Sequence, residues 1–182
     1  MGVCFISGVY GVGKSTIAHE LASVLHIPSF ACSELISHVN GEDYSVTKTV
    51  SNKEKNQDIL ASQVSQLLMT HSKMILTGHF CIVNKENSVD ILPANIFDKL
   101  HLDRIILLDA SSDKILENLK SRDCRNYPED TIEAIRRQER TSAQETAARL
   151  SCPLIIHQMQ YNGQDLESLL NALHDKNDAQ NR

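Results

Sequence analysis

The sequence is poor in aromatic residues and in the residues that interrupt regular structure. It has no Trp, four Tyr and four Phe, together with seven Gly and four Pro in 182 residues. So few aromatic side chains argue against a surface on which nucleic-acid bases stack. No run approaches the roughly 20 apolar residues that a membrane-spanning helix needs. With 41% hydrophobic residues, the chain can instead fill the core of one globular domain.

Paired cysteines and a surplus of positive charge are also missing. The five cysteines are scattered without a CxxC pair, so we expect reduced thiols and neither a disulfide framework nor a zinc site. The chain has 18 Lys and Arg against 23 Asp and Glu, whereas nucleic-acid-binding proteins usually carry a basic surplus. The N-terminal stretch lacks the basic flank of a signal peptide. We therefore expect a cytoplasmic monomer or homodimer with no nucleic-acid or membrane partner.

Short apolar runs alternate with segments in which apolar residues recur at helical spacing. Buried strands are predicted at 2–7, 29–32, 74–76, 103–109 and 153–157. This alternation is typical of parallel βαβ units. The sequence therefore predicts a three-layer α/β fold with a doubly wound parallel sheet of about five strands. It forms one domain over residues 1–175, followed by a flexible tail at 176–182.

The first predicted strand leads into a phosphate-binding motif. Residues 8–15 (GVYGVGKS) match G-x-x-x-x-G-K-[ST], and the match follows a strand and opens a helix. Glycines let successive N–H groups point at a phosphate, and the helix dipole favours negative charge there. We expect Lys14 to reach the β and γ phosphates and the Ser15 hydroxyl to ligate Mg²⁺. The predicted ATP-binding residues are Gly8, Tyr10, Gly11, Val12, Gly13, Lys14, Ser15 and Thr16.

A phosphate loop alone does not separate kinases from GTPases or ATPases, but the rest of the sequence favours a small kinase. It has no late N/T-K-x-D base-reading motif and no room for the extra helical domain of ring-forming ATPases. None of its eight arginines precedes position 104, and five lie within residues 122–140. Planar guanidinium groups suit the neutralisation of a moving phosphoryl group. Lys14, Arg122 and Arg125 are the predicted catalytic residues.

Three further arginines allow two interpretations. Arg136, Arg137 and Arg140 fall on one predicted helix, where Arg136 and Arg140 share a face. They are candidates for the same phosphoryl-transfer role. The alternative is a solvated helix on which these arginines are interspersed with glutamates, among them Glu133 and Glu139.

Two stretches carry a resemblance to a known family. FISGVYGVGKST and IILLDASSDKILENLKSRDCRNYPED resemble the short P-loop nucleotide kinases, and are most similar to archaeal-type adenylate kinases. The resemblance spans nearly the whole chain. It implies a P-loop NTPase fold, ATP and Mg²⁺ as cofactors, and an acceptor-binding excursion at residues 33–60. It also implies a short lid at residues 122–130, in which Arg122 and Arg125 close over the phosphates.

The chain departs from this family at two places. Such kinases commonly carry an Asp at the end of the third strand, near Mg²⁺, and here Thr77 stands at that position. Either Thr77 or Asp109 organises the metal-bound waters, or activity is low. Many nucleoside monophosphate kinases also hold the acceptor phosphate with an Arg from the first half of the chain, which has none here. Three lysines, or an Arg of the long helix such as Arg137, are possible substitutes; the lysines are Lys48, Lys53 and Lys55.

The predicted function is Mg²⁺-ATP-dependent phosphoryl transfer to a small molecule, first of all a nucleoside monophosphate. A kinase for a nucleoside or metabolite hydroxyl is one alternative, and a nucleotide-binding switch or assembly ATPase is another. The predicted substrate-binding residues are Lys48, Gln57, His79 and Arg137. His79 follows a strand at the ligand edge of the sheet, although a lone His is often structural. Gln57 and the preceding Asn56 are candidates for reading the edge of a base.

Overall fold

The computed structural model describes residues 2–40, 53–84, 88–123 and 127–180. The main sheet has five strands, which are β1 (Gly2–Ser7), β2 (Ser29–Ala31), β3 (Lys73–Thr77), β6 (Leu102–Asp109) and β7 (Leu154–Gln158). They form one parallel sheet in the order β2-β3-β1-β6-β7. The strand order reverses between β3 and β6, on the two sides of β1. In open α/β sheets this is the point at which ligands bind.

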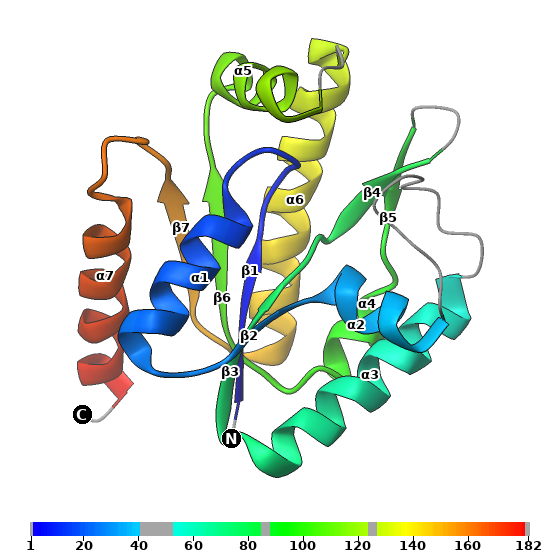
Figure 1. Ribbon diagram of the computed structural model, residues 1–182, viewed down its shortest axis with the longest axis vertical. Coiled ribbons are helices and arrows are strands. Elements are labelled where there is room, and N and C mark those ends of the chain that lie inside the picture. The colour runs from blue at the N-terminus through cyan, green and yellow to red at the C-terminus, as the bar shows by residue number, and fades with distance from the viewer. Residues whose placement is uncertain (1, 41–52, 85–87, 124–126, 181–182) are drawn as a thin grey trace.

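Helices cover both faces of the sheet (Figure 1). They are α1 (Lys14–Leu25), α2 (Cys32–Asn40), α3 (Lys53–Thr70), α4 (Ala94–Asp98), α5 (Ser112–Asp123), α6 (Glu129–Leu150) and α7 (Asp165–Gln180). A two-stranded antiparallel hairpin of β4 (Cys81–Val83) and β5 (Val89–Ile91) projects between β3 and α4. Among the described residues, no helix combines the length and the hydropathy that crossing a bilayer would require.

The alternation of side chains along the strands builds two separate cores. Val3 and Phe5 of β1 pack on one face with apolar residues of α3, α4 and α6. Ile6 points to the opposite face and packs with residues of α1, α5 and α7. Successive side chains of a strand point to opposite faces, so β1 is buried on both sides. The central strand is therefore fixed on both faces, and the loop that follows it is held in a defined position.

The carboxyl ends of β1, β3 and β6 meet at one edge of the sheet, at the top of Figure 1. The phosphate loop leaves β1 there and enters α1, and α5 lies above it. The turn after β3 and the β4–β5 hairpin flank the loop on the other side (Figure 1). Residues from distant parts of the chain therefore converge around the phosphate loop.

The structure confirms the predicted three-layer, doubly wound fold and its five parallel strands. It differs from the prediction in detail. The β4–β5 hairpin was not predicted, because two three-residue strands are too short to show a period. Helix α7 continues to Gln180, into the part predicted as a flexible tail. Arg122 lies in the last turn of α5 rather than in a break between helices.

Candidate functional site

The phosphate loop joins the buried end of β1 to the N-terminus of α1. Gly11 and Gly13 have φ angles of 80° and 100°, a region that glycine adopts readily and other residues rarely do. The Lys14 ammonium lies 2.7 Å from the carbonyl oxygen of Gly8 and 3.0 Å from that of Val9, and donates a hydrogen bond to each. The side chain thus curls back over the loop, so its charge lies at the loop and not in open solvent.

Two of the predicted ATP-binding residues, Gly8 and Val12, anchor the loop to the protein interior. The Gly8 amide donates to a carboxylate oxygen of Glu139, and a Cβ at this glycine would lie 2.3 Å from the carbonyl oxygen of Leu108. The Val12 side chain is fully buried in the core. Neither residue lines the cavity described below, so their described contacts position the loop.

Side chains that the sequence analysis missed hold the outer turn of the loop. Asn118 of α5 donates from Nδ2 to the carbonyl oxygen of Gly11, at 3.0 Å. The Tyr161 hydroxyl, from the segment between β7 and α7, donates to the carbonyl oxygen of Val12, at 3.2 Å. Burial raises the pKa of Tyr161 to about 12, so this donor keeps its proton at neutral pH. The loop is therefore held by α5, by the segment between β7 and α7, and by α6 through Glu139.

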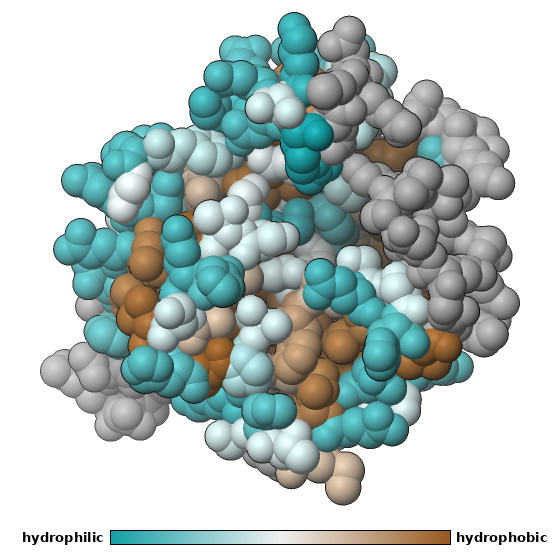
Figure 2. Space-filling model, viewed as in Figure 1, coloured by the Kyte–Doolittle hydropathy of each residue, from teal (hydrophilic) through white to brown (hydrophobic). Residues whose placement is uncertain are grey.

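A cavity of about 490 Å³ opens beside the phosphate loop. Figure 2 shows a recess on this face, below the hydrophilic surface over α5. Nine of the predicted site residues line the cavity; they are Tyr10, Gly11, Gly13, Lys14, Ser15, Thr16, Gln57, His79 and Arg122. Thr77 and Asn56 line it as well. The structure thus brings together the predicted phosphate-binding and acceptor-binding groups.

Three other predicted residues are not part of this group. Arg137 lies on α6 and does not line the cavity. It is two residues from Glu139, so the two side chains point to different sides of the helix. Lys48 and Arg125 lie outside the described residues. Their proposed contacts with an acceptor and with phosphate stay predictions.

Glu139 of α6 is a central residue of the site, whereas one of the two interpretations left open by the sequence placed it on a solvated helix. That interpretation is wrong for this side chain, which is 1% exposed. One oxygen accepts hydrogen bonds from the backbone amides of Phe80 and Cys81, at 2.8 and 3.1 Å, and the other accepts from Gly8, at 3.2 Å. A buried carboxylate is costly unless such donors surround it. Glu139 therefore ties the phosphate loop to the turn after β3.

His79 lies on the cavity wall between Tyr10 and Glu139. Its ring centroid is 4.2 Å from that of Tyr10, and its Nδ1 atom is 3.5 Å from a carboxylate oxygen of Glu139. Burial, and then the charge of Glu139, raises the pKa of Tyr10 above its ordinary range, so the phenol stays neutral. With its own proton on Nδ1, facing the Glu139 carboxylate, the imidazole can accept a second proton at Nε2. This arrangement suits a group that accepts a proton during a reaction.

Hydroxyl groups, and no carboxylates, are available for a metal ion at the cavity. Ser15 lines it at the N-terminus of α1, and Thr77 lies at the end of β3 with 8% exposure. No Asp or Glu lines the cavity, and no cluster of three or more His, Cys, Asp or Glu could hold a metal, within the described residues. Mg²⁺ bound to a nucleotide commonly uses one or two protein ligands, the phosphates and waters. The hydroxyl of Ser15, supported by Thr77, fits an ion of that kind.

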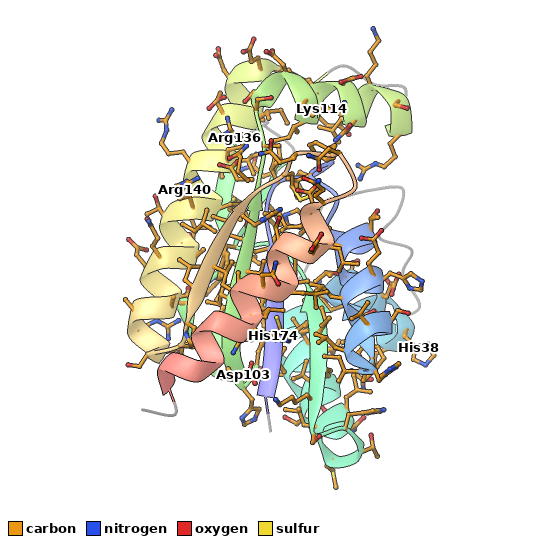
Figure 3. The ribbon with its side chains drawn as sticks, turned by 90° about the vertical axis from the view of Figure 1, so that its left-hand side faces the viewer. His38, Asp103, Lys114, Arg136, Arg140 and His174 are labelled. Carbon is orange, nitrogen blue, oxygen red and sulfur yellow. The ribbon has the colours of Figure 1, made fainter. Side chains whose placement is uncertain are left out.

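Asp109, the other candidate that the sequence offered for organising the metal-bound waters, does not line the cavity and is paired with arginines of α6. Arg136 and Arg140 lie close together on α6 (Figure 3). One oxygen of Asp109 accepts from Arg136 Nε and the other from Arg140 Nη2, each at 2.9 Å. Arg136 also pairs with Glu133. Burial by itself would raise the pKa of Asp109, but the hydrogen bonds from both arginines hold it below its usual value. The cluster joins the end of β6 to α6 and does not line the cavity.

Asp109→Asn is therefore expected to lower stability at neutral pH by roughly 2 kcal/mol, or about 4–8 °C in Tm, because it leaves two arginines without their shared partner. An unfolded Asp has a pKa of about 3.9, so the stabilisation by Asp109 is complete above that pH. It is lost as pH falls through the lower pKa of the folded state. The Tm difference between the wild type and the variant should consequently narrow in acid.

Thermal melts at pH 7 and near pH 3 check this expectation. Asp58→Asn is the matched control, because Asp58 is 76% exposed and pairs with the exposed Lys99. A gap between wild type and Asp109→Asn that stays constant with pH would mean that the two arginine pairs do not carry the stabilisation.

The four cysteines in the described residues are free thiols. Cys32 lines the cavity, and burial raises its pKa to about 12. Burial and the neighbouring Glu139 raise the pKa of Cys81 further. Both are neutral at physiological pH.

The chain is similar to several known proteins. A family model described as an AAA domain matches residues 7–136. A curated shikimate kinase of Psychromonas ingrahamii is 28% identical over 87 residues, which cover 48% of this chain and 51% of that protein. The chain therefore spans about half the length of this curated relative.

Solved structures share the fold over nearly the full chain. A shikimate kinase from Aquifex aeolicus is 18% identical with a TM-score of 0.59, and covers 97% of this chain and 98% of its own. A gluconokinase from Sinorhizobium meliloti is 12% identical with a TM-score of 0.57, and covers 100% and 98%. At these identities the likeness shows the fold alone. These matches do not single out the archaeal-type adenylate kinases that the sequence motifs resemble.

Proposed function

We propose that this chain, which belongs to the AAA domain family, is a phosphotransferase that moves the γ-phosphoryl group of ATP to a hydroxyl group on a small molecule. One observation carries the proposal. The cavity is lined at one end by Lys14, Ser15 and Arg122 and continues past His79 into an apolar region. A site for nucleotide phosphates and a space for a second substrate thus lie in one continuous cavity.

The hydroxyl of a metabolite or nucleoside is supported better than a nucleoside monophosphate, which the sequence placed first. The curated relative is a shikimate kinase, whose name gives shikimate, and not a nucleoside monophosphate, as its acceptor. The described residues at the apolar end of the cavity also include no Lys or Arg that would hold an acceptor phosphate. Transfer of the phosphoryl group to a nucleoside monophosphate is the alternative within the same reaction class.

The proposed reaction is an in-line transfer. The acceptor oxygen forms a bond to the γ-phosphorus while the bond to the β–γ bridging oxygen breaks, and ADP leaves with that electron pair. His79 takes the hydroxyl proton at Nε2, and its Nδ1–H then faces Glu139 at 3.5 Å. Lys14 and Arg122 stabilise the charge that spreads over the phosphoryl oxygens.

Mg²⁺ would be held by the Ser15 hydroxyl and the nucleotide phosphates, with Thr77 bonded to one of its waters. When bound, the ion neutralises the charge on the β and γ phosphates. The described cavity wall contains no carboxylate that would compete for this role. The Thr77 hydroxyl also lies 3.5 Å from the carbonyl oxygen of Phe30, which orients it at the end of β3.

An acceptor panel tests the proposal. The protein is incubated with ATP, Mg²⁺ and nucleosides, nucleoside monophosphates, sugars and hydroxy acids, and ADP and the phosphorylated product are both measured. We expect ADP and phosphorylated product in equal amounts with at least one hydroxyl acceptor. ADP release that no acceptor increases, with no phosphorylated product, would instead indicate a hydrolysing switch protein.

Arg122→Ala is expected to lower kcat by about 10²-fold, near 3 kcal/mol, with little change in ATP affinity. Arg122 is exposed at the end of α5 yet lines the cavity, so its charge matters chiefly when the phosphoryl group is between the two oxygens. Lys120→Ala, an exposed cation on the same helix, is the control and should behave as wild type. Normal turnover in both variants would favour the switch protein, whose slow hydrolysis does not depend on a lid.

A further inference from the structure

The two ends of the cavity differ in chemistry. The phosphate end is lined by Lys14, Ser15, Asn118 and Arg122. The far end is lined by aliphatic and aromatic side chains from β1, α2, α3, the hairpin region, and α4 with the residues just after it. They are Phe5, Ile36, Leu60, Ile82, Leu92, Ile96, Phe97 and Leu100. Any acceptor that reaches the phosphate end must therefore rest its body on an apolar wall.

This apolar wall is a rigid part of the core. Phe5 packs edge-on against Phe80 and Phe97, with ring centroids 5.2 and 5.7 Å apart. Phe5, Phe97 and Leu100 are each at most 3% exposed. Gly78 lets the turn after β3 lie directly on Phe5, since a Cβ there would be 2.8 Å from the ring. Close packing of this kind fixes the shape of the far end before a ligand binds.

Among the described residues that line the cavity, the charged side chains lie at the phosphate end. Among the described residues that line the cavity, Lys14 and Arg122 are the Lys or Arg side chains, and no Asp or Glu is present. The polar groups between the two ends are neutral amides, hydroxyls and a thiol, from Ser33, Asn56, Gln57, Thr77 and Cys32. An anion transferred to the far end would lose its hydration without gaining a cationic partner there, which is costly.

We propose that the acceptor is an uncharged alcohol with an apolar or aromatic body, bound against the apolar wall, with its hydroxyl directed toward His79 and the phosphate loop. This inference rests on the proposed function and names its substrate class. Asn56 and Gln57 line the cavity from the first turns of α3. Amide side chains hydrogen-bond neutral polar groups, so these two residues are suited to bind polar atoms of such an acceptor. Burial of the apolar body would supply the affinity.

Pairs of related compounds, in which one member carries an anionic group and the other is neutral, test this class. The pairs are adenosine and AMP, methyl shikimate and shikimate, and 3-(hydroxymethyl)benzamide and 3-(hydroxymethyl)benzoate. Binding to the protein with ADP is measured by calorimetry, and transfer from ATP is measured separately. We expect the neutral member to bind at least tenfold more tightly in one or more pairs, and no anionic member to bind more tightly than its partner. Any other pattern of binding overturns the inference.

A change of charge in the cavity provides a second test. Ile36 is partly exposed at the edge of the cavity on α2, so Ile36→Lys can keep its ammonium hydrated. It should shift the ratio of anionic to neutral affinity by at least tenfold toward the anion, while ATP affinity stays unchanged. Val39→Lys is the control, because Val39 is on the same helix, is 49% exposed and does not line the cavity. An unchanged ratio in Ile36→Lys would also overturn the inference.

The two measurements separate this inference from the proposed function. Neutral compounds that bind but are not phosphorylated would contradict the phosphotransferase and leave the preference for an uncharged ligand intact. Anionic compounds that are phosphorylated and bind more tightly would support the phosphotransferase and contradict the substrate class.

Discussion

Lys14→Ala is expected to abolish detectable phosphoryl transfer, with a loss of at least about 10²–10³-fold in kcat. Lys14 carries its charge at the phosphate loop, where it is partly buried and hydrogen-bonded to the carbonyl oxygens of Gly8 and Val9. When ATP is bound, this ammonium can turn to the β and γ phosphates. A single charged donor at such a water-poor position is worth about 3–4 kcal/mol of transition-state stabilisation.

The fold should survive this substitution. Lys14 lies at the surface-facing start of α1, and the loop keeps its contacts with Glu139, Asn118 and Tyr161. Turnover is measured with the best acceptor of the panel, and Tm is measured in parallel. Lys99→Ala, which removes a half-exposed lysine paired with Asp58, should change neither activity nor Tm appreciably. Near-normal turnover of Lys14→Ala would contradict the assignment of the phosphate loop as the catalytic site.

The parts of the site that were predicted from the sequence are those encoded locally. The phosphate loop depends on glycines, a lysine and a serine within eight residues, between a strand and a helix. Its conformation is therefore visible as a pattern. The alternation of strands and helices likewise predicted the sheet, because the period of each segment depends on its own residues.

Residues that act over long distances in the sequence were missed or misassigned. Glu139 accepts a hydrogen bond from the amide of Gly8, 131 positions away in the sequence. Its sequence neighbours are polar or charged, and they are equally consistent with a solvated glutamate. Arg136 and Arg140 were candidates for catalysis, whereas both are paired with Asp109. Helical spacing predicted that Arg136 and Arg140 share a face, but only the packing of α6 against β6 identifies their partner. Tertiary contact decides the role of such groups.

Glu139→Gln is expected to destabilise the fold and to impair transfer together. The side-chain amide keeps one acceptor oxygen but places an NH₂ group against a backbone N–H donor, either that of Gly8 or those of Phe80 and Cys81. Loss of a buried, charge-assisted acceptor and the resulting donor–donor contact cost roughly 3 kcal/mol. For a chain of this size we expect Tm to fall by roughly 6–12 °C.

The effect on catalysis should exceed what the lower stability explains. Without the carboxylate, the imidazolium of His79 loses the opposite charge 3.5 Å from Nδ1, and the phosphate loop is no longer fixed to the turn after β3. Transfer measured well below the Tm of the variant should fall by about tenfold or more, since small displacements of positioning groups are costly. The acid limb of the pH dependence of kcat should also shift to lower pH, because the imidazolium of His79 loses the negative charge that stabilises it and gives up its proton more readily.

Glu145→Gln is the matched control for Glu139→Gln. Glu145 lies on the same helix and is exposed, so its substitution removes the same charge from α6 without touching the loop. It should leave Tm and transfer within error of the wild type. Equal behaviour of the two variants would show that the net charge of α6 matters and that the buried contacts of Glu139 do not. A large fall in Tm with unchanged transfer would restrict Glu139 to a structural role and remove its support for His79 as the proton acceptor.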